Sequence, residues 1–221
     1  MLTKITEKVY AVADTHIGVK GALEKLAALV REILEKTKPG DLIVWCGDLT
    51  NLGREREWLN FIYVIKPILR DRENMFLPGN HDIALWNGIG PPSFRKRRRF
   101  RYFTNVNSVL QGHRYGVVGL STTETTVRSI GAQGKLGSGQ LDALDNVLEA
   151  AIKPLVLCMH HKPIWERPGL RLHDADEFKE VLSRHHGKVK RIVCGHRHTE
   201  LVISAHDGWP EIISLPSVAY P

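Results

Sequence analysis

Five short groups of polar residues contain the side chains best suited to chemistry in this chain, and each follows an apolar stretch. Carboxylate, amide and imidazole groups together suit borderline divalent cations. One group alone is equally well explained as a turn or a helix cap, so the prediction of a metal site depends on their joint occurrence. The groups are Asp14-Thr15-His16, Gly47-Asp48, Gly79-Asn80-His81-Asp82, His160-His161 and Gly195-His196-Arg197-His198.

Apolar runs before these groups predict the strands that position them. The runs are continuous rather than alternating, which is typical of a sheet covered on both faces. Because functional residues of α/β sheets gather at the carboxyl ends of strands, the polar groups are expected to meet there. At an extended strand end, Asp14 and His16 would point to the same side. The strands are expected at residues 9–13, 42–46, 75–77, 155–159 and 191–194.

Helices are expected between the strands, because apolar residues recur at spacings of three and four. The resulting alternation predicts a layered α/β fold, with one domain over residues 1–221. Helices are expected at about residues 21–36, at 54–69 with Pro67 disturbing the end, from an N-cap at Ser138, and at 174–186. The other expected elements are a hairpin of residues 106–110 and 115–120, last strands at 200–205 and 211–215, and a long loop at about 83–104.

The composition is that of an ordinary globular domain, with 43% apolar and 25% charged residues. There is no apolar run of about 18 residues for a membrane span, and the first residues lack a signal-peptide layout. The three cysteines, at 46, 158 and 194, are expected as buried thiols in a reducing compartment. We therefore expect a cytoplasmic protein without a membrane partner, and the sequence leaves its oligomeric state open.

The formal charge of +7 is concentrated in one stretch, because six basic residues fall between positions 95 and 101. Three interpretations are open: a solvated loop, a lid that gathers phosphate through arginine side chains, and a nucleic-acid contact over residues 95–103. The last gains from aromatic residues that are able either to stack on bases or to anchor the loop, namely Phe94, Phe100, Tyr102 and Phe103.

The order of the five groups resembles the calcineurin-like metallophosphoesterase superfamily, over most of the chain from about Val9 to His198. The chain lacks Asp-Arg-Gly after Gly-Asp and lacks Gly-Asn-His-Glu, so it looks more like the cyclic-nucleotide and small phosphodiesterase branch than like the Ser/Thr protein phosphatases. The resemblance implies a four-layer α-β-β-α sandwich, with two mixed sheets flanked by helices, and a dinuclear metal centre.

The resemblance also implies a role for each matching residue. Two divalent ions are expected, among Mn, Fe, Zn, Co and Ni, with Mn the best candidate for activity in vitro. In that family a metal-bridging hydroxide attacks phosphorus, and His81 would then protonate the leaving oxygen or stabilise the charge that gathers on it. One ion would be held by Asp14, His16, Asp48 and His198, and the other by Asp48, Asn80, His160 and His196, with Asp48 as the bridge.

Further residues are expected around these ligands. Asn51 stands where many relatives have an aspartate that orients the histidine equivalent to His81, and an amide stabilises imidazolium less than a carboxylate would. Asn51 and Asp82 are expected to lie behind the ligands. Substrate contacts are expected from Arg197, His161, Arg97 and Arg99.

A phosphodiesterase acting on a phosphoester, with nucleotides among the candidate substrates, is the function expected first. Two alternatives are a nuclease whose basic loop holds DNA or RNA and a non-catalytic metal-binding interaction module.

Overall fold

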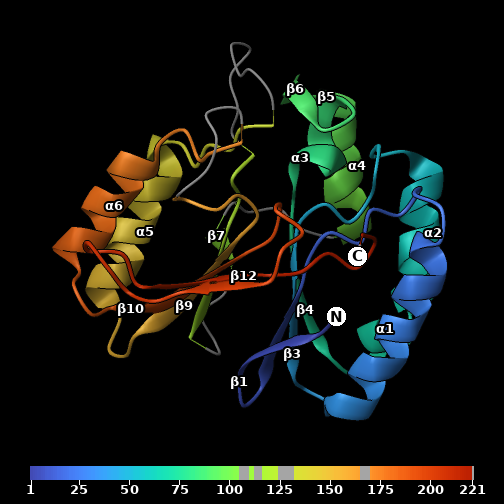
Figure 1. The fold of residues 1–221 in the computed structure, drawn as a ribbon, viewed down its shortest axis with the longest axis horizontal. Helices are drawn as coiled ribbons and strands as arrows, with labels where there is room; N and C mark the ends of the chain where they lie inside the picture. The colour runs from blue at the N-terminus through green and yellow to red at the C-terminus, as the bar shows by residue number, and fades with distance from the viewer. Residues whose placement is uncertain (105–109, 112–115, 124–131, 165–169, 221) are drawn as a thin grey trace.

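Two β-sheets pack face to face between layers of helices in the computed structural model of the protein (Figure 1), which describes residues 1–104, 110–111, 116–123, 132–164 and 170–220. Most neighbouring strands run parallel, and three edge strands, β1, β7 and β11, pair antiparallel with their neighbours. This confirms the expected α/β sandwich of two mixed sheets flanked by helices. The first sheet has the order β1 (Thr3–Thr6), β2 (Val9–Val12), β3 (Leu42–Cys46) and β4 (Glu73–Leu77). The second has the order β11 (Leu201–Ile203), β12 (Glu211–Ser214), β10 (Val189–Cys194), β9 (Leu155–Met159), β8 (Val117–Leu120) and β7 (Leu110–Gln111).

Helices cover the outer side of each sheet, as Figure 1 shows. The first sheet is flanked by α1 (Ala22–Lys36), α2 (Glu55–Ile65) and α4 (Phe94–Thr104), and the second by α5 (Ser138–Ala150) and α6 (Ala175–Arg184). The helix expected over 54–69 is divided, because α2 ends at Ile65 and Pro67 precedes a short 3-10 turn, η1 (Ile68–Arg70).

The buried strands divide their side chains between two apolar cores. On β2, Val9 and Ala11 lie in the core between the sheets, whereas Tyr10 and Val12 pack toward the helices, as the two-residue period of a strand requires. The apolar runs therefore reflect burial on both faces. All three cysteines are buried and free, as expected.

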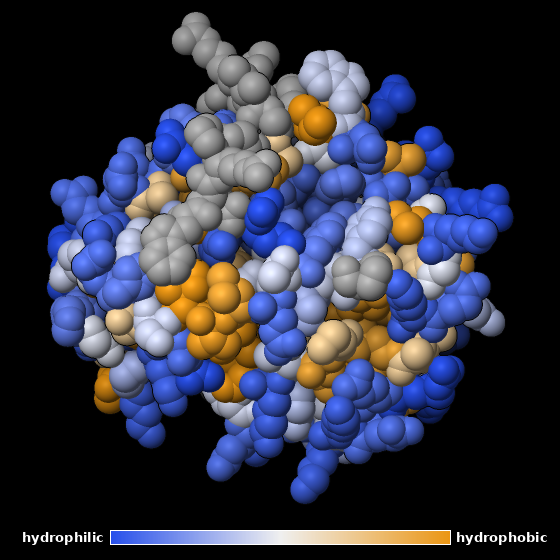
Figure 2. Space-filling view, in the orientation of Figure 1, coloured by the Kyte–Doolittle hydropathy of each residue, from blue (hydrophilic) through white to orange (hydrophobic). Residues whose placement is uncertain are grey.

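Residues 83–104, which were expected to form a long loop, instead contain the last residue of the short helix α3 (Asn80–Ile83), a hairpin and a helix. β5 (Ala84–Trp86) and β6 (Ile89–Pro92) pair through a two-residue turn at Asn87-Gly88, where both residues have positive φ. Figure 2 shows hydrophobic residues at the top of the molecule over this hairpin. The basic run lies on α4, because Phe100 and Phe103 recur at helical spacing and pack on Trp58 of α2, with ring centroids at 5.6 and 6.1 Å.

Smaller differences concern the ends of elements. Strand β1 was not anticipated, and Gly137 rather than Ser138 occupies the N-cap of α5. β7 and β8 pair antiparallel, although residues 106–109 and 112–115 of the expected hairpin lie outside the described residues. Within the described chain, no helix has both the length and the apolar character needed to cross a membrane.

The packing of α4 on Trp58 leads to a stability prediction. Phe100→Ala should lower the free energy of unfolding by about 3 kcal/mol, because it removes a buried ring and leaves a cavity beside Trp58. Tyr102→Ala on the same helix should change it by less than about 0.5 kcal/mol, because that ring is 79% exposed. Denaturant titration of both variants measures the difference. Equal effects would show that α4 is not anchored through Phe100.

Candidate active site

All five polar groups lie beyond the carboxyl ends of strands, at one edge shared by the two sheets. Backbone hydrogen bonds join the groups within each sheet: the Asp14 N–H donates to the Gly47 carbonyl at 3.0 Å, and the Gly195 N–H to the His160 carbonyl at 3.1 Å. Between the sheets, the His196 N–H donates to the Asp14 carboxylate at 3.0 Å. Both sheets therefore build a single site.

Asp14, His16 and His198 form a first cluster of donor atoms. Nε2 of His16 lies 3.1 Å from Nε2 of His198. Oδ1 of Asp14 lies 3.8 Å from the His16 nitrogen and 3.5 Å from the His198 nitrogen. Donor atoms this close together, of these chemical types, suit one divalent cation.

His160 and Asn80 form the second cluster, and each is oriented by a backbone carbonyl. The Nδ1–H of His160 donates to the Cys46 carbonyl at 2.8 Å, which directs Nε2 inward to 3.1 Å from Oδ1 of Asn80. The amide nitrogen of Asn80 donates to the Gly88 carbonyl at 2.9 Å, so the amide oxygen is the atom presented to the site. Nε2 of His160 and Oδ1 of Asn80 thus face the same place.

Asp48 lies between the two clusters. Its Oδ2 is 3.7 Å from Nε2 of His16 and 3.3 Å from Nε2 of His160, and its Oδ1 accepts the His81 N–H at 2.9 Å. Burial alone would raise the pKa of Asp48, but the neighbouring histidines, His160 first, hold it well below its usual range. An ionised carboxylate is thus placed where two cations would share it.

Several imidazole nitrogens at the site have no hydrogen-bond partner among the described residues. They are Nδ1 of His16 and Nε2 of both His161 and His196, all buried. Burial lowers the pKa of His16 to about 4 and the pKa values of His161 and His196 well below the usual range, so these rings are neutral at pH 7. The opposite shift occurs at His160, where burial lowers the pKa but the Asp48 carboxylate raises it more, to about 9. Since buried polar atoms are normally satisfied, the unpartnered Nε2 of His196, an expected ligand, fits cation binding.

Backbone strain is concentrated in the same residues. Five of the seven non-glycine residues with positive φ in the described chain are expected metal ligands. Such conformations cost of order 1 to 3 kcal/mol each and gather at functional sites. The convergence of Asp14 and His16 is present, but left-handed backbone produces it, so the extended-strand argument for it was wrong. The five residues are Asp14, His16, Asp48, His196 and His198.

Asp82 joins the two loops that carry Asp48 and Asn80. Its fully buried carboxylate accepts hydrogen bonds from the Thr50 N–H and hydroxyl, both at 2.8 Å, and from the Gly79 N–H at 3.0 Å. Burial, followed by the charge of Asp48, raises the pKa of Asp82 to about 6. Asp82 therefore lies behind the expected ligands and holds their loops together.

His81 is held by backbone atoms on two sides. Its Nδ1 lies 2.8 Å from the Asn51 carbonyl oxygen, so Nδ1–H donates to the backbone of Asn51 rather than to its side chain. Gly88 of the β5–β6 turn lies against the ring, because a Cβ at that position would be 2.5 Å from Nε2 of His81. This turn was not predicted, although Asn-Gly is a strong signal for a two-residue hairpin.

Tyr220 is a site residue that the sequence analysis did not identify. Its ring stacks on His198 with centroids at 4.8 Å and an interplanar angle of 11°, and meets His16 edge to face at 5.2 Å. The segment before Tyr220 is hydrogen-bonded to the site, because the Ser217 hydroxyl donates to the Asp14 carbonyl at 2.9 Å. No local pattern marks Tyr220, since only the tertiary fold returns it to the histidines.

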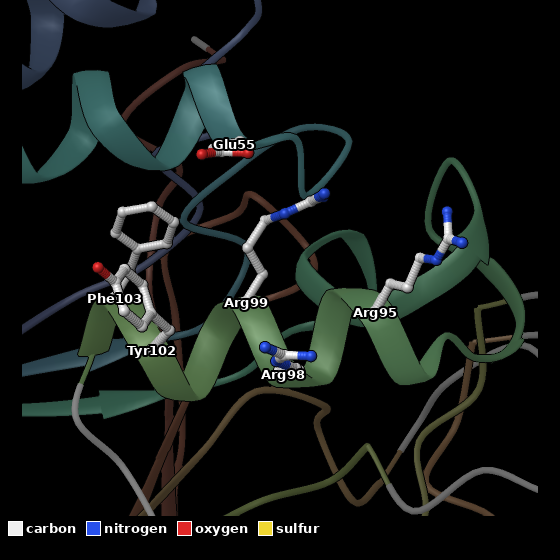
Figure 3. Close-up of a pocket in the computed structure, with 6 residues that line it drawn as sticks. All are labelled: Glu55, Arg95, Arg98, Arg99, Tyr102 and Phe103. Carbon is white, nitrogen blue, oxygen red and sulfur yellow. The ribbon is translucent and has the colours of Figure 1, made fainter.

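The residues expected to contact substrate differ in position. Arg197 is exposed between the two site histidines of its loop, whereas His161 is fully buried and its Nδ1 lies 2.7 Å from the Thr122 hydroxyl. Arg97 donates to the Thr123 carbonyl at 2.9 Å, and Arg99 to the Gly53 carbonyl at 2.8 Å. Arg99 also lines a hollow between α2 and α4 (Figure 3). These positions make Arg197 the most accessible of the four.

The comparisons with known proteins agree with this geometry. The sequence model of the calcineurin-like phosphoesterase family matches residues 7–200, and the chain belongs to that family. It is therefore a hydrolase that acts on phosphoric ester bonds. The expected resemblance is confirmed, and the family together with the clusters of histidine and aspartate supports a two-metal centre.

Two curated proteins are similar in sequence. The chain is 28% identical over 206 residues to a probable glycerophosphodiester phosphodiesterase of Arcobacter nitrofigilis, covering 86% of this chain and 71% of that protein. It is 34% identical over 73 residues to a probable cyclic nucleotide phosphodiesterase of a Synechococcus species, covering 31% of this chain and 28% of that protein.

Solved structures share the fold at low identity. A dimetal phosphatase from Danio rerio superimposes with a TM-score of 0.63 at 15% identity, covering 96% of this chain and 87% of that one. A phosphopantetheinyl hydrolase from Mycobacterium tuberculosis gives a TM-score of 0.60 at 13% identity, covering 96% and 90%. These likenesses support the sandwich architecture.

The close approach of Gly79 to Asp48 leads to a prediction about metal binding. A Cβ at Gly79 would lie 2.1 Å from Oδ1 of Asp48, so Gly79→Ala should displace that carboxylate and lower the bound metal per chain, measured by elemental analysis after dialysis. Gly139→Ala is the matched control, because nothing lies within 4 Å of that position. A Gly79→Ala variant with full metal content would contradict the assignment of Asp48 as a ligand.

Stacking of Tyr220 on His198 leads to a second prediction. Tyr220→Ala should weaken Mn²⁺ binding in calorimetric titration by about tenfold, the usual effect of removing a residue that orients a ligand. Tyr220→Phe should keep the affinity, because the ring remains and only the hydroxyl is lost. Equal losses in both variants would show that the hydroxyl rather than the stacked ring matters.

Proposed function

We propose that the protein hydrolyses phosphodiesters at a dinuclear metal centre built from the two donor clusters. The observation that carries this proposal is the convergence of seven expected ligands with buried, unpartnered imidazole nitrogens among them. Asp14, His16 and His198 would hold one cation, and Asn80, His160 and His196 the other. Asp48 would bridge them, since its Oδ2 faces both His16 and His160.

The chemistry that two such cations supply is Lewis acidity toward phosphate oxygens and a lowered pKa for water. The residues of the chain supply the rest. The Nδ1–H of His160 donates to the Cys46 carbonyl and so fixes that ring. Asp82 connects the Asp48 and Asn80 loops through its hydrogen bonds from Thr50 and Gly79. We infer that Mn²⁺ supports activity in vitro, because the mixed oxygen and nitrogen donors suit it.

His81 is the proposed proton donor to the leaving oxygen. With Nδ1–H donated to the Asn51 carbonyl, Nε2 is the nitrogen left to hold the transferred proton. His81 would therefore serve as the acid, while Arg197 would contact the substrate phosphate from the exposed side of the site.

Diesters are preferred in this proposal because both curated relatives carry phosphodiesterase names. Glycerophosphodiesters and nucleotides are the substrate classes that follow. All seven proposed ligands are present, which argues against a non-catalytic module. The buried free thiols agree with a reducing compartment, and we infer a cytoplasmic location from them.

A nuclease is the second candidate, and α4 is the observation that favours it. Its basic residues lie on a helix next to α3, the short helix that carries His81. The Lys96 ammonium donates to the carbonyl of Ala84, the residue that follows α3, at 2.7 Å. If the protein is a nuclease, removal of charge from α4 should abolish cleavage of oligonucleotides and spare a small chromogenic diester.

Hydrolysis of bis-p-nitrophenyl phosphate against p-nitrophenyl phosphate, with added Mn²⁺, tests the proposal. Wild type should prefer the diester. Asn80→Ala should lose bound metal and about a hundredfold in kcat, whereas His81→Ala should lose a similar factor with metal content unchanged, because an acid and not a ligand is removed.

Matched controls are Asn146→Ala and His186→Ala, which remove the same side-chain types at exposed positions away from the site. Two metals per chain without turnover of either ester would contradict the proposal. Loss of metal in His81→Ala would instead make His81 a ligand and remove it as the acid.

A further inference from the structure

The solvent-exposed face of helix α4 has an unusual composition. Its buried side consists of Phe100 and Thr104, with Phe103 half-buried beside them, whereas the exposed side alternates cationic and aromatic residues. Phe94 and Tyr102 are 80% and 79% exposed. Tyr102 meets the Phe103 ring edge to face, with centroids at 5.1 Å, and its other side faces solvent. Large rings exposed to water mark interaction surfaces more often than structural ones. The exposed residues of α4 are Phe94, Arg95, Arg98, Arg101 and Tyr102.

The cations of this face are not neutralised within the described chain. Arg95, Arg98 and Arg101 make no hydrogen bond or ion pair there, and the helix contains no acidic residue. Like charges spaced three and four residues apart on a helix repel each other and destabilise it. A bound polyanion would turn this repulsion into attraction.

A hollow of about 460 Å³ lies beside the face, between α4 and the start of α2 (Figure 3). Figure 3 shows Arg99 reaching from α4 toward the loop before α2, and Tyr102 and Phe103 together at the far end of the helix. Arg99 is fixed there by its hydrogen bond to the Gly53 carbonyl. The hollow thus combines guanidinium groups with aromatic rings, opposed by the single carboxylate of Glu55.

The chemistry of this surface favours single-stranded nucleic acid over an anionic membrane. Arginine forks pair with phosphates, and flat rings stack on unpaired bases without regard to sequence. No aliphatic side chain lies on the exposed face of α4, whereas insertion into lipid relies on apolar residues. Apolar side chains are exposed on the adjoining hairpin, at Leu85, Trp86 and Ile89, so membrane binding is the outcome against which the proposal must be tested.

We propose that the outer face of α4 and the hollow beside α2 bind single-stranded nucleic acid. Phosphates lie on Arg95, Arg98 and Arg101, and a base stacks on Tyr102. α4 adjoins α3 (Asn80–Ile83), the short helix that carries His81, because Lys96 of α4 donates to the carbonyl of Ala84, the residue that follows α3. The inference deepens the nuclease candidate and rests on it for cleavage, whereas binding depends on α4 alone.

Fluorescence anisotropy of a labelled oligothymidylate, in EDTA so that no turnover occurs, measures binding by the full chain. The α4 triple variant combines Arg95→Gln, Arg98→Gln and Arg101→Gln. The magnitude of its slope of log affinity against log salt concentration should be smaller by about 2, since three phosphate contacts are lost. A control variant that removes the same charge at exposed positions elsewhere should leave that slope unchanged. It combines Lys20→Gln, Arg31→Gln and Lys153→Gln. Tyr102→Ala should weaken binding about tenfold through lost stacking.

Two results would overturn the inference. One is equal weakening by both triple variants, which would reduce the effect to net charge. The other is that the α4 variants lose binding only to vesicles of phosphatidylcholine with phosphatidylserine and not to the oligonucleotide. Hydrolysis of the small diester by the α4 triple variant should remain at the wild-type level, so failure of binding and failure of the proposed hydrolysis are separate outcomes.

Discussion

The closeness of the Asp48 carboxylate to the Gly79 backbone is the constraint on which the site depends. Only a residue without Cβ leaves room for Oδ1 of Asp48 there. This approach lets the His81 N–H donate to Oδ1 while Oδ2 faces His16 and His160. A buried charge in such a position needs compensation, and hydrogen-bond donors together with cations are the available means.

The two sheets contribute to the site unequally but cannot form it separately. The first sheet supplies the carboxylates and the Asn80 amide, whereas the second supplies most of the imidazoles. Hydrogen bonds from His196 to the Asp14 carboxylate, and from Ser217 to the Asp14 carbonyl, connect the two halves. Left-handed backbone at five expected ligands is tolerated because these contacts and the cores beneath them over-determine the conformation.

The β5–β6 hairpin and helix α4 lie around this centre and contact its residues. The β5–β6 turn presses its Gly88 backbone on His81 and orients Asn80, and α4 holds the hairpin through Lys96. Arg97 reaches the other half of the molecule at Thr123. The basic helix α4 is therefore connected both to the hairpin that contacts His81 and to the second half of the molecule.

The sequence by itself determined the strands and the expected ligands, because continuous apolar runs followed by histidine, aspartate or asparagine are local patterns. It also identified the family, since the order of those motifs does not depend on packing. It misjudged residues 84–104, where the charges of α4 obscured the helical spacing of Phe100 and Phe103 around Trp58. Only the tertiary structure decided the left-handed backbone at Asp14 and His16, the use of the Asn51 carbonyl by His81, and the stacking of Tyr220 on His198. Those features arise from contacts between residues far apart in the chain, and such contacts leave no periodicity in the sequence.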